Sequence, residues 1–198
     1  MTLYHQAAAL LVTFIWGTNF VLIRYALDEI GPFTLAALRF LFVAFPLVFF
    51  LPIPNAQWRY IIAYGLLIGV GQFGLLFWAM QGDITPGLAS LLIQLQVFFT
   101  IILTVINLKE SVSVRQVMAM ALSFCGLILI ILNSNEATTI VGVAIVLTAA
   151  MSWASGNLII KRIGKVNGIA FLAWSSLFAI PPLALTAFYL KGVAEVFT

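Results

Sequence analysis

The sequence predicts an all-α protein, a polytopic membrane helix bundle with about seven transmembrane helices, and three observations carry this prediction. First, 64% of the 198 residues are hydrophobic and only 8% are charged, which leaves too little polar surface to cover a soluble globule. Second, the apolar residues gather in seven runs of about 20 residues, the length that a spanning helix needs. Third, one segment recurs 137 residues further along the chain, which indicates an internal repeat.

Each apolar run is predicted to be a helix rather than a strand. Lipid offers no partner to an unpaired backbone group, and the runs are too long and too unalternating for barrel strands. The first run has the position of a signal peptide, but it lacks a basic start and takes part in the repeat, so we interpret it as a retained span. The predicted helices cover residues 5–23, 32–51, 59–80, 86–107, 116–132, 140–160 and 168–190.

Taken in order, the predicted helices are separated by short connectors with turn-forming or charged residues. We expect Glu110, between the fourth and fifth helices, to neutralise Lys109 or Arg115. The turn-forming connectors carry Gly31-Pro32, Pro52-Ile53-Pro54-Asn55, Gly82-Asp83 and Asn133-Ser134-Asn135.

The repeat pairs the first predicted helix with the sixth. The segment from Trp16 to Arg24 matches the segment from Trp153 to Lys161, and the same offset pairs Gly31 with Gly168. The step from the first helix to the sixth is five spans, an odd number, so the second copy enters the membrane from the opposite side. Inverted repeats of this kind build secondary transporters, whose halves rock about a central site; an old duplication without a transport role is the alternative. The predicted units are a first five-helix repeat at 1–135 and the start of a second, inverted repeat at 136–198.

Basic residues are divided unevenly between the two sets of connectors. The nine Lys and Arg residues form no dense cluster, so a membrane explains them better than a nucleic acid does. With a cytoplasmic N-terminus, six of them lie in inward connectors and two in outward connectors, as the positive-inside rule favours. The inward residues are Arg59, Lys109, Arg115, Lys161, Arg162 and Lys165, and the outward residues are Arg24 and Lys191.

Several motifs carry a family resemblance over the whole chain. They are Trp16-Gly17-Thr18-Asn19-Phe20, Leu38-Arg39-Phe40, the fourth run at 87–101, Lys109-Glu110, Gln116 and Gly126. With these motifs the chain resembles the EamA family of the drug/metabolite transporter superfamily. The resemblance implies ten spans in two inverted repeats of five, with the first, third, fourth and sixth spans around the substrate path.

One variation on the family pattern points to a substrate class. Many members carry a proline in the fourth span, where this chain keeps the pair Gln94 and Gln96. This variant is similar to the O-acetylserine/cysteine exporter branch. The resemblance therefore implies a bacterial inner-membrane exporter of small amino-acid-like metabolites that works by alternating access.

The chain also departs from the family pattern, because counterparts of the third, fourth and fifth spans are missing from the second repeat. We expect a truncated product with part of the cavity wall absent. The expected partners are a small-molecule substrate, the lipid bilayer, and a second copy or the missing C-terminal spans.

Polar side chains inside the fourth span are the first candidates for substrate binding, because polar groups in hydrocarbon usually face the bundle interior or a wet cavity. Ser90 and Gln94 are four residues apart, as are Gln96 and Thr100, which gives two polar edges. We expect both edges to flank one cavity, where amide groups suit a zwitterion because they donate and accept. The alternative is hydrogen bonding between helices.

Each copy of the repeat presents an aromatic side chain and an amide together. Trp16 and Asn19 are three residues apart on the first helix, and Trp153 and Asn157 are four apart on the sixth. We expect the rings to wall a cavity and the amides to orient substrate. Anchoring at the membrane interface is the other role that Trp commonly has.

Arg39 and Gln72 complete the set of candidate site residues. Arg39 lies seven residues after Pro32, well inside the hydrocarbon. One interpretation is a fixed cation that attracts a substrate carboxylate or holds a neighbouring carbonyl. The alternative is a structural residue whose side chain extends to the membrane interface. Gln72 lies in a glycine-rich third helix that includes Gly65 and Gly69, a spacing typical of close helix packing.

Catalytic, metal and cofactor sites are not predicted. One His, one Cys and no clustered acids give no metal site and no nucleophilic triad, so we expect no enzymatic activity. All six acids lie at or near connectors, so no carboxylate at mid-membrane is available to carry protons. An assembly or scaffold subunit is the rival class, and a drug, a purine or a nucleotide sugar are the alternative substrates.

Overall fold

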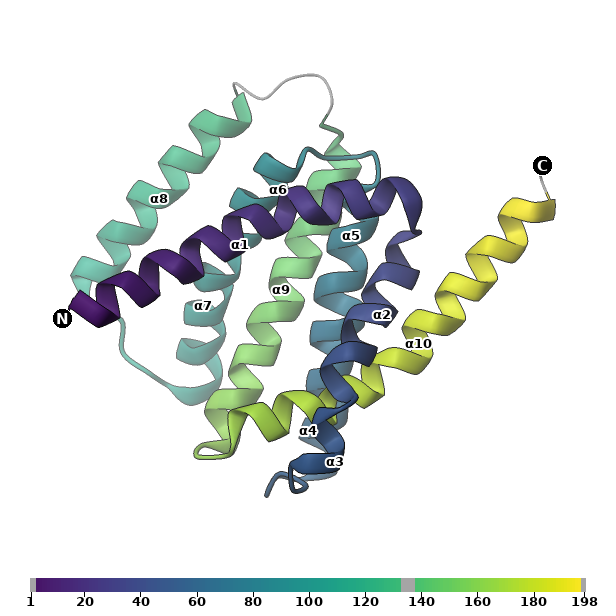
Figure 1. Ribbon diagram of the computed structural model, residues 1–198. Coiled ribbons are helices and arrows are strands. Elements are labelled where there is room, and N and C mark those ends of the chain that lie inside the picture. Colours follow the sequence, from purple (N-terminus) through teal and green to yellow (C-terminus); the bar gives the residue numbers. More distant parts are fainter. Residues whose placement is uncertain (1–2, 133–137, 197–198) are drawn as a thin grey trace.

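The computed structural model describes residues 3–132 and 138–196, and the ordered elements of these two ranges are all helices (Figure 1). Most are α-helical, while η1 is a π-helical segment and η2 a short 3₁₀ turn. The helices are α1 (Leu3–Glu29), α2 (Pro32–Ala44), α3 (Leu47–Phe50), α4 (Trp58–Leu66), η1 (Leu67–Gly74), α5 (Leu75–Met80), α6 (Pro86–Leu92), η2 (Ile93–Leu95), α7 (Gln96–Leu108), α8 (Val114–Leu132), α9 (Ile140–Ile163) and α10 (Gly168–Val196).

The predicted membrane helix bundle is confirmed. Six helical stretches in the described ranges are long and apolar enough to cross a membrane. The predicted fifth helix forms α8, whose apolar part is shorter than the other six. The connector at Asn133 to Asn135, the expected boundary between residues 135 and 136, and Glu136 lie outside the described residues.

Three of the spans are not continuous α-helices, which the apolar pattern did not predict. The second span breaks between α2 and α3 at Pro46, because proline lacks the N–H that an interior helical position needs. The third span widens into η1 between α4 and α5. The fourth span tightens into η2 between α6 and α7. These changes alter which side chains face each neighbour.

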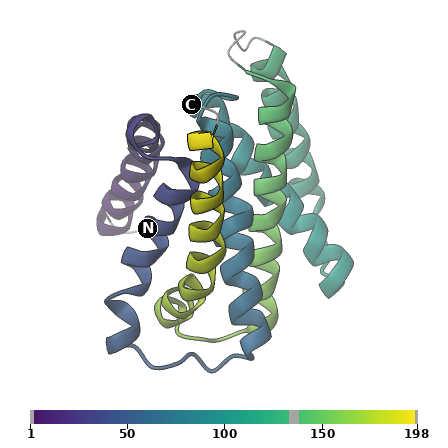
Figure 2. The ribbon, with the colours of Figure 1, turned by 90° about the vertical axis from the view of Figure 1, so that its right-hand side faces the viewer.

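Equivalent helices of the two copies run in opposite directions. In Figure 1, α1 runs from the lower left to the upper right, whereas α9 descends; α2 descends, whereas α10 rises. The opposed helices α2 and α10 also pack against each other, and both views show them side by side (Figures 1 and 2). The helices that the predicted repeat pairs thus run in opposite directions, as a step of five spans from one to the other requires.

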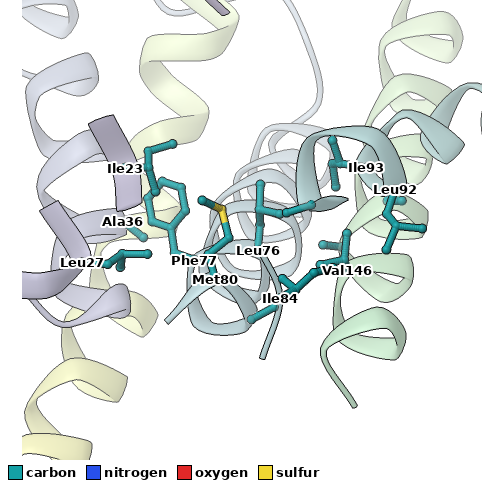
Figure 3. Close-up of a cluster of buried hydrophobic side chains, with 14 of the residues drawn as sticks. Ile23, Leu27, Ala36, Leu76, Phe77, Met80, Ile84, Leu92, Ile93 and Val146 are labelled. Atoms are coloured by element: carbon teal, nitrogen blue, oxygen red, sulfur yellow. The ribbon is translucent and has the colours of Figure 1, made fainter. Parts of the chain in front are cut away.

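The apolar core lies where α1 and α2 meet the third span, and it continues to α6 and α9 (Figure 3). Phe77 and Met80 of α5 are each 1% exposed, and they pack within one cluster with Ile23 of α1 and Val146 of α9. In contrast, most residues of α8 and of the first half of α1 are exposed. The core therefore surrounds the third span.

Small residues let the third span approach both α9 and α10 closely. A Cβ atom added at Gly69 would overlap the Cβ of Ala179 on α10, and one added at Gly65 would overlap the carbonyl oxygen of Ser175. On the other side, a Cβ at Gly71 would lie 2.6 Å from the Ser152 hydroxyl oxygen of α9. The third span thus fills the position between the two helices of the second copy.

Candidate substrate cavity

A cavity of about 250 Å³ lies between α1, α2, the third span and α9; we call it the central cavity. Its volume is below the range of about 300–1,000 Å³ that drug-sized ligands occupy, so it suits a smaller molecule. Aromatic and aliphatic side chains form most of its wall. Five of the nine predicted site residues line it, namely Trp16, Asn19, Arg39, Gln72 and Trp153.

Two tryptophans, one from each copy of the repeat, meet at one wall of the central cavity. The rings of Trp16 on α1 and Trp153 on α9 pack edge to face, with centroids 5.8 Å apart and planes at 73°. This geometry is favourable for aromatic pairs. Residues that are equivalent in the repeat therefore come into contact across the cavity.

Arg39 is held against the ring of Phe73. The guanidinium carbon lies 4.4 Å from the ring centroid, within the range of a cation–π interaction. The two ion pairs among the described residues lie elsewhere, between Arg24 and Asp28 and between Lys161 and Glu110. Arg39 therefore has an aromatic neighbour in the described chain but no carboxylate partner.

Gln72 enters the central cavity from η1. Its side chain is 4% exposed, and the amide has no hydrogen-bond partner among the described residues. The side chain of Asn19, opposite on α1, likewise has none in the described ranges. Amide groups that lack protein partners can bind water or a ligand instead, and π-helical segments often occur at functional sites. The two amides therefore leave donors and acceptors for a guest molecule.

Ser90 and Gln94 line a different space. With Trp16 they border an open groove of about 750 Å³ between α1 and the fourth span. The Ser90 hydroxyl donates to the carbonyl of Gly87 at 2.7 Å. Trp16 borders both the groove and the central cavity, so its indole separates the two spaces.

Gln96 and Asn157 bind each other rather than facing the central cavity. The Asn157 side-chain Nδ2 donates to Gln96 Oε1 at 2.8 Å and to Thr100 Oγ1 at 3.2 Å. These bonds join α9 to α7, which is the inter-helix role weighed as the alternative. The two polar edges of the fourth span thus face different neighbours and do not flank one cavity.

Polar contacts also link both ends of α9 to the residues that flank the fourth span. At one end the backbone N–H of Thr139 donates to the carbonyl of Asp83 at 2.9 Å. At the other end Lys161 Nζ lies 2.6 Å from Glu110 Oε2. The expectation that Glu110 neutralises Lys109 or Arg115 was wrong, because folding brings the end of α9 to this carboxylate.

Phe73 and Tyr64 are cavity residues that the sequence reasoning missed. An aromatic residue in an apolar span resembles any lipid-facing side chain, so composition gives no signal. Phe73 follows Gln72 directly, and both residues of the π-helical segment η1 line the same cavity. Tyr64 packs edge to face on Phe171 of α10, with centroids 5.1 Å apart.

No group of three or more His, Cys, Asp or Glu side chains suited to a metal ion occurs in the described part of the chain. The fold and the cavity define a class: a multi-pass helical membrane protein with polar side chains around an internal space. The EamA-like transporter family model matches residues 5–132. The chain belongs to this family of transporters.

Two similar relatives are each named "Probable amino-acid metabolite efflux pump". The one from Salmonella typhimurium is 38% identical and the one from Escherichia coli 37% identical, both over 95% of this chain. The chain spans 65% of the length of each. The uncharacterized transporter YoaV of Bacillus subtilis is 27% identical over 92% of the chain and 66% of its own length. No solved structure matches the chain significantly.

Proposed function

We propose that the chain is a secondary transporter that exports small amino-acid-like metabolites, of the O-acetylserine/cysteine type, by alternating access. The observation that carries the proposal is the central cavity, because it is lined by Trp16 and Trp153, which are equivalent positions on oppositely directed helices. A site shared by inverted helices can be exposed to either side by similar movements. The printed names of the two bacterial relatives support the substrate class.

The proposed location is the bacterial inner membrane, with a cytoplasmic N-terminus. In Figure 1 the connectors from α3 to α4, from α7 to α8 and from α9 to α10 lie at the lower side of the molecule. The six basic residues that the positive-inside rule assigns to the cytoplasm lie in these connectors or in the adjoining terminal turns of α4, α8 and α9. A reporter fused after Lys165 should read cytoplasmic, and a robust periplasmic signal would reverse the orientation.

Export of cysteine from cells that express the chain tests the function. We expect Gln72→Ala to reduce export about tenfold at equal membrane abundance, because a polar contact in a cavity contributes about 1.4 kcal/mol or more. Gln94→Ala tests the open groove in the same assay, with loss of export expected. Gln57→Ala is the matched control, since Gln57 is exposed in the connector before α4. Export by Gln72→Ala and Gln94→Ala at the level of the wild type and of Gln57→Ala would contradict the proposal.

A scaffold or assembly subunit is the second candidate, favoured by the exposed apolar residues along α1 and α8. Such a subunit tolerates Gln72→Ala and Gln94→Ala without loss of its activity. Assembly with a second copy or with further spans stays a prediction. Cross-linking in membranes, followed by mass analysis of the products, distinguishes a chain that works alone from one that pairs.

A further inference from the structure

We propose that Arg39 is the carboxylate anchor of the central cavity, and that the cavity therefore takes small zwitterions with a free α-carboxylate. This inference rests on the proposed function and deepens it, since it assigns one chemical group of the substrate to one side chain. Four properties of Arg39 support the assignment: its charge, its depth, its contact with Phe73 and the residues around it.

The charge of Arg39 lacks a compensating partner within the described chain. Its position, seven residues after the start of α2, puts it roughly 11 Å below the helix end by helix rise. A cation at this depth is costly unless an anion or a wet cavity faces it. No Asp or Glu lines the central cavity. The site therefore carries a fixed positive charge and leaves the negative charge to be supplied by a ligand.

Phe73 keeps the guanidinium at this depth. A long side chain that reaches for the interface would leave the third span, yet the Arg39 guanidinium carbon lies 4.4 Å from the Phe73 ring centroid. The contact is with the ring, and no hydrogen bond occupies the guanidinium N–H groups within the described residues. Those N–H groups match the two oxygens of a carboxylate in a bidentate pair.

A ligand can reach Arg39 from the central cavity. Arg39 and Asn19 line both the central cavity and a neighbouring cavity of about 210 Å³ between α1 and α2. The cation thus lies at the junction of two small spaces. Because the side chain is also exposed in the described fold, binding requires no prior rearrangement of the arginine.

Other residues of the cavity wall suit the ammonium group of a zwitterion. The unpartnered amide of Gln72 is 4% exposed and offers a carbonyl oxygen as acceptor. Trp16 and Trp153 add aromatic surface, which attracts cations. The volume of about 250 Å³ limits the remaining side chain of the guest to a short one. A molecule with an ammonium group, a carboxylate and a short substituent satisfies all three parts of the wall.

Ligand binding to the purified full chain in lipid nanodiscs tests the assignment, with intrinsic tryptophan fluorescence as the readout. The probes are L-cysteine, L-cysteine methyl ester and cysteamine, which share the ammonium and thiol groups but differ in the carboxylate. We expect L-cysteine to bind at least about tenfold more tightly than either analogue. In Arg39→Gln this preference should fall to about onefold, and Arg39→Lys should retain part of it.

Two further variants control for folding and charge. Arg24→Gln removes an arginine that pairs with Asp28 at the end of α1, outside the central cavity, and should keep the full preference. Phe73→Leu removes the aromatic support and should weaken L-cysteine binding while affecting cysteamine less. Only variants with the helical content and monodispersity of the wild type are compared. If Arg39→Gln misfolds, the binding preferences of Arg39→Lys and Phe73→Leu are used to test the assignment instead.

The outcomes separate the inference from the proposed function. If the wild type prefers L-cysteine and folded Arg39→Gln keeps that preference, or if Arg39→Lys and Phe73→Leu both keep it in full, the carboxylate role is wrong and the exporter proposal stands. If the wild type does not distinguish the probes, or binds none, the anchor is also wrong. In that case cysteine export by cells decides the proposed function independently. Loss of the preference in Arg39→Gln but not in Arg24→Gln establishes the anchor.

Discussion

The hydrogen bond between Asn157 and Gln96 allows a quantitative test of how the sixth and fourth spans are held together. We predict that Asn157→Leu destabilises the fold by about 1–3 kcal/mol, because Gln96 is only 9% exposed and its Oε1 atom would lose its inter-helix donor. The smaller values measured for hydrogen bonds between membrane helices, about 0.6 kcal/mol on average and about 1.7 at most, set the expected coupling in a double-mutant cycle.

The assay is reversible unfolding in mixed micelles, followed by circular dichroism, for the wild type, Asn157→Leu, Gln96→Leu and the double variant. We expect the double variant to be less destabilised than the sum of the singles by about 0.6–1.7 kcal/mol. Cysteine binding should stay within about twofold in Asn157→Leu, since Asn157 does not line the central cavity. Strictly additive effects, or a loss of binding without a loss of stability, would refute the inter-helix role and restore Asn157 as a substrate ligand.

Two further predictions concern packing and surface charge. Gly69→Ala should destabilise the protein by about 1–3 kcal/mol, because its new Cβ meets the Cβ of Ala179. The control Gly87→Ala should not destabilise it, because no atom lies within 4 Å of the new Cβ. Equal melting temperatures for the two variants would contradict the close approach of Gly69 to Ala179. Lys161→Glu should cost at most about 1 kcal/mol, because the pair with Glu110 is exposed. The double variant Lys161→Glu/Glu110→Lys restores the opposite charges and should recover that stability at low salt. A loss larger than about 1 kcal/mol that the double variant does not recover would show that the ion pair is not the cause.

The fourth span shows where prediction from the sequence succeeded and where it stopped. The apolar run predicted a helix over 86–107, and the span ends at Leu108, a difference within the ordinary fraying of helix ends. The spacing also identified Gln94 and Gln96 as polar groups in hydrocarbon. However, two residues correspond to roughly 200° on an α-helix, so the two amides cannot easily face one cavity. Gln94 faces the open groove and Gln96 faces α9.

The third span illustrates a feature that the sequence pattern does not encode. Its glycines predicted close packing, and Gly65 and Gly69 do approach α10. The π-helical turns of η1 were not predicted, because the apolar pattern of the third span does not distinguish them from ordinary α-helical turns. For the same reason Phe73 was not identified beside Gln72, although it supports Arg39.

Contacts along the whole length of α9 determine which parts of the protein can move separately. Thr139 binds Asp83 at one end, Asn157 binds Gln96 near the middle, and Lys161 binds Glu110 at the other end. We therefore expect the fourth and sixth spans to move as one body, although the predicted repeat assigns them to different copies. On this expectation, the boundary between moving bodies does not follow the division between the two predicted repeat units. Distances between labels on α7 and α9 should stay constant through a transport cycle, while distances from α1 to α9 change.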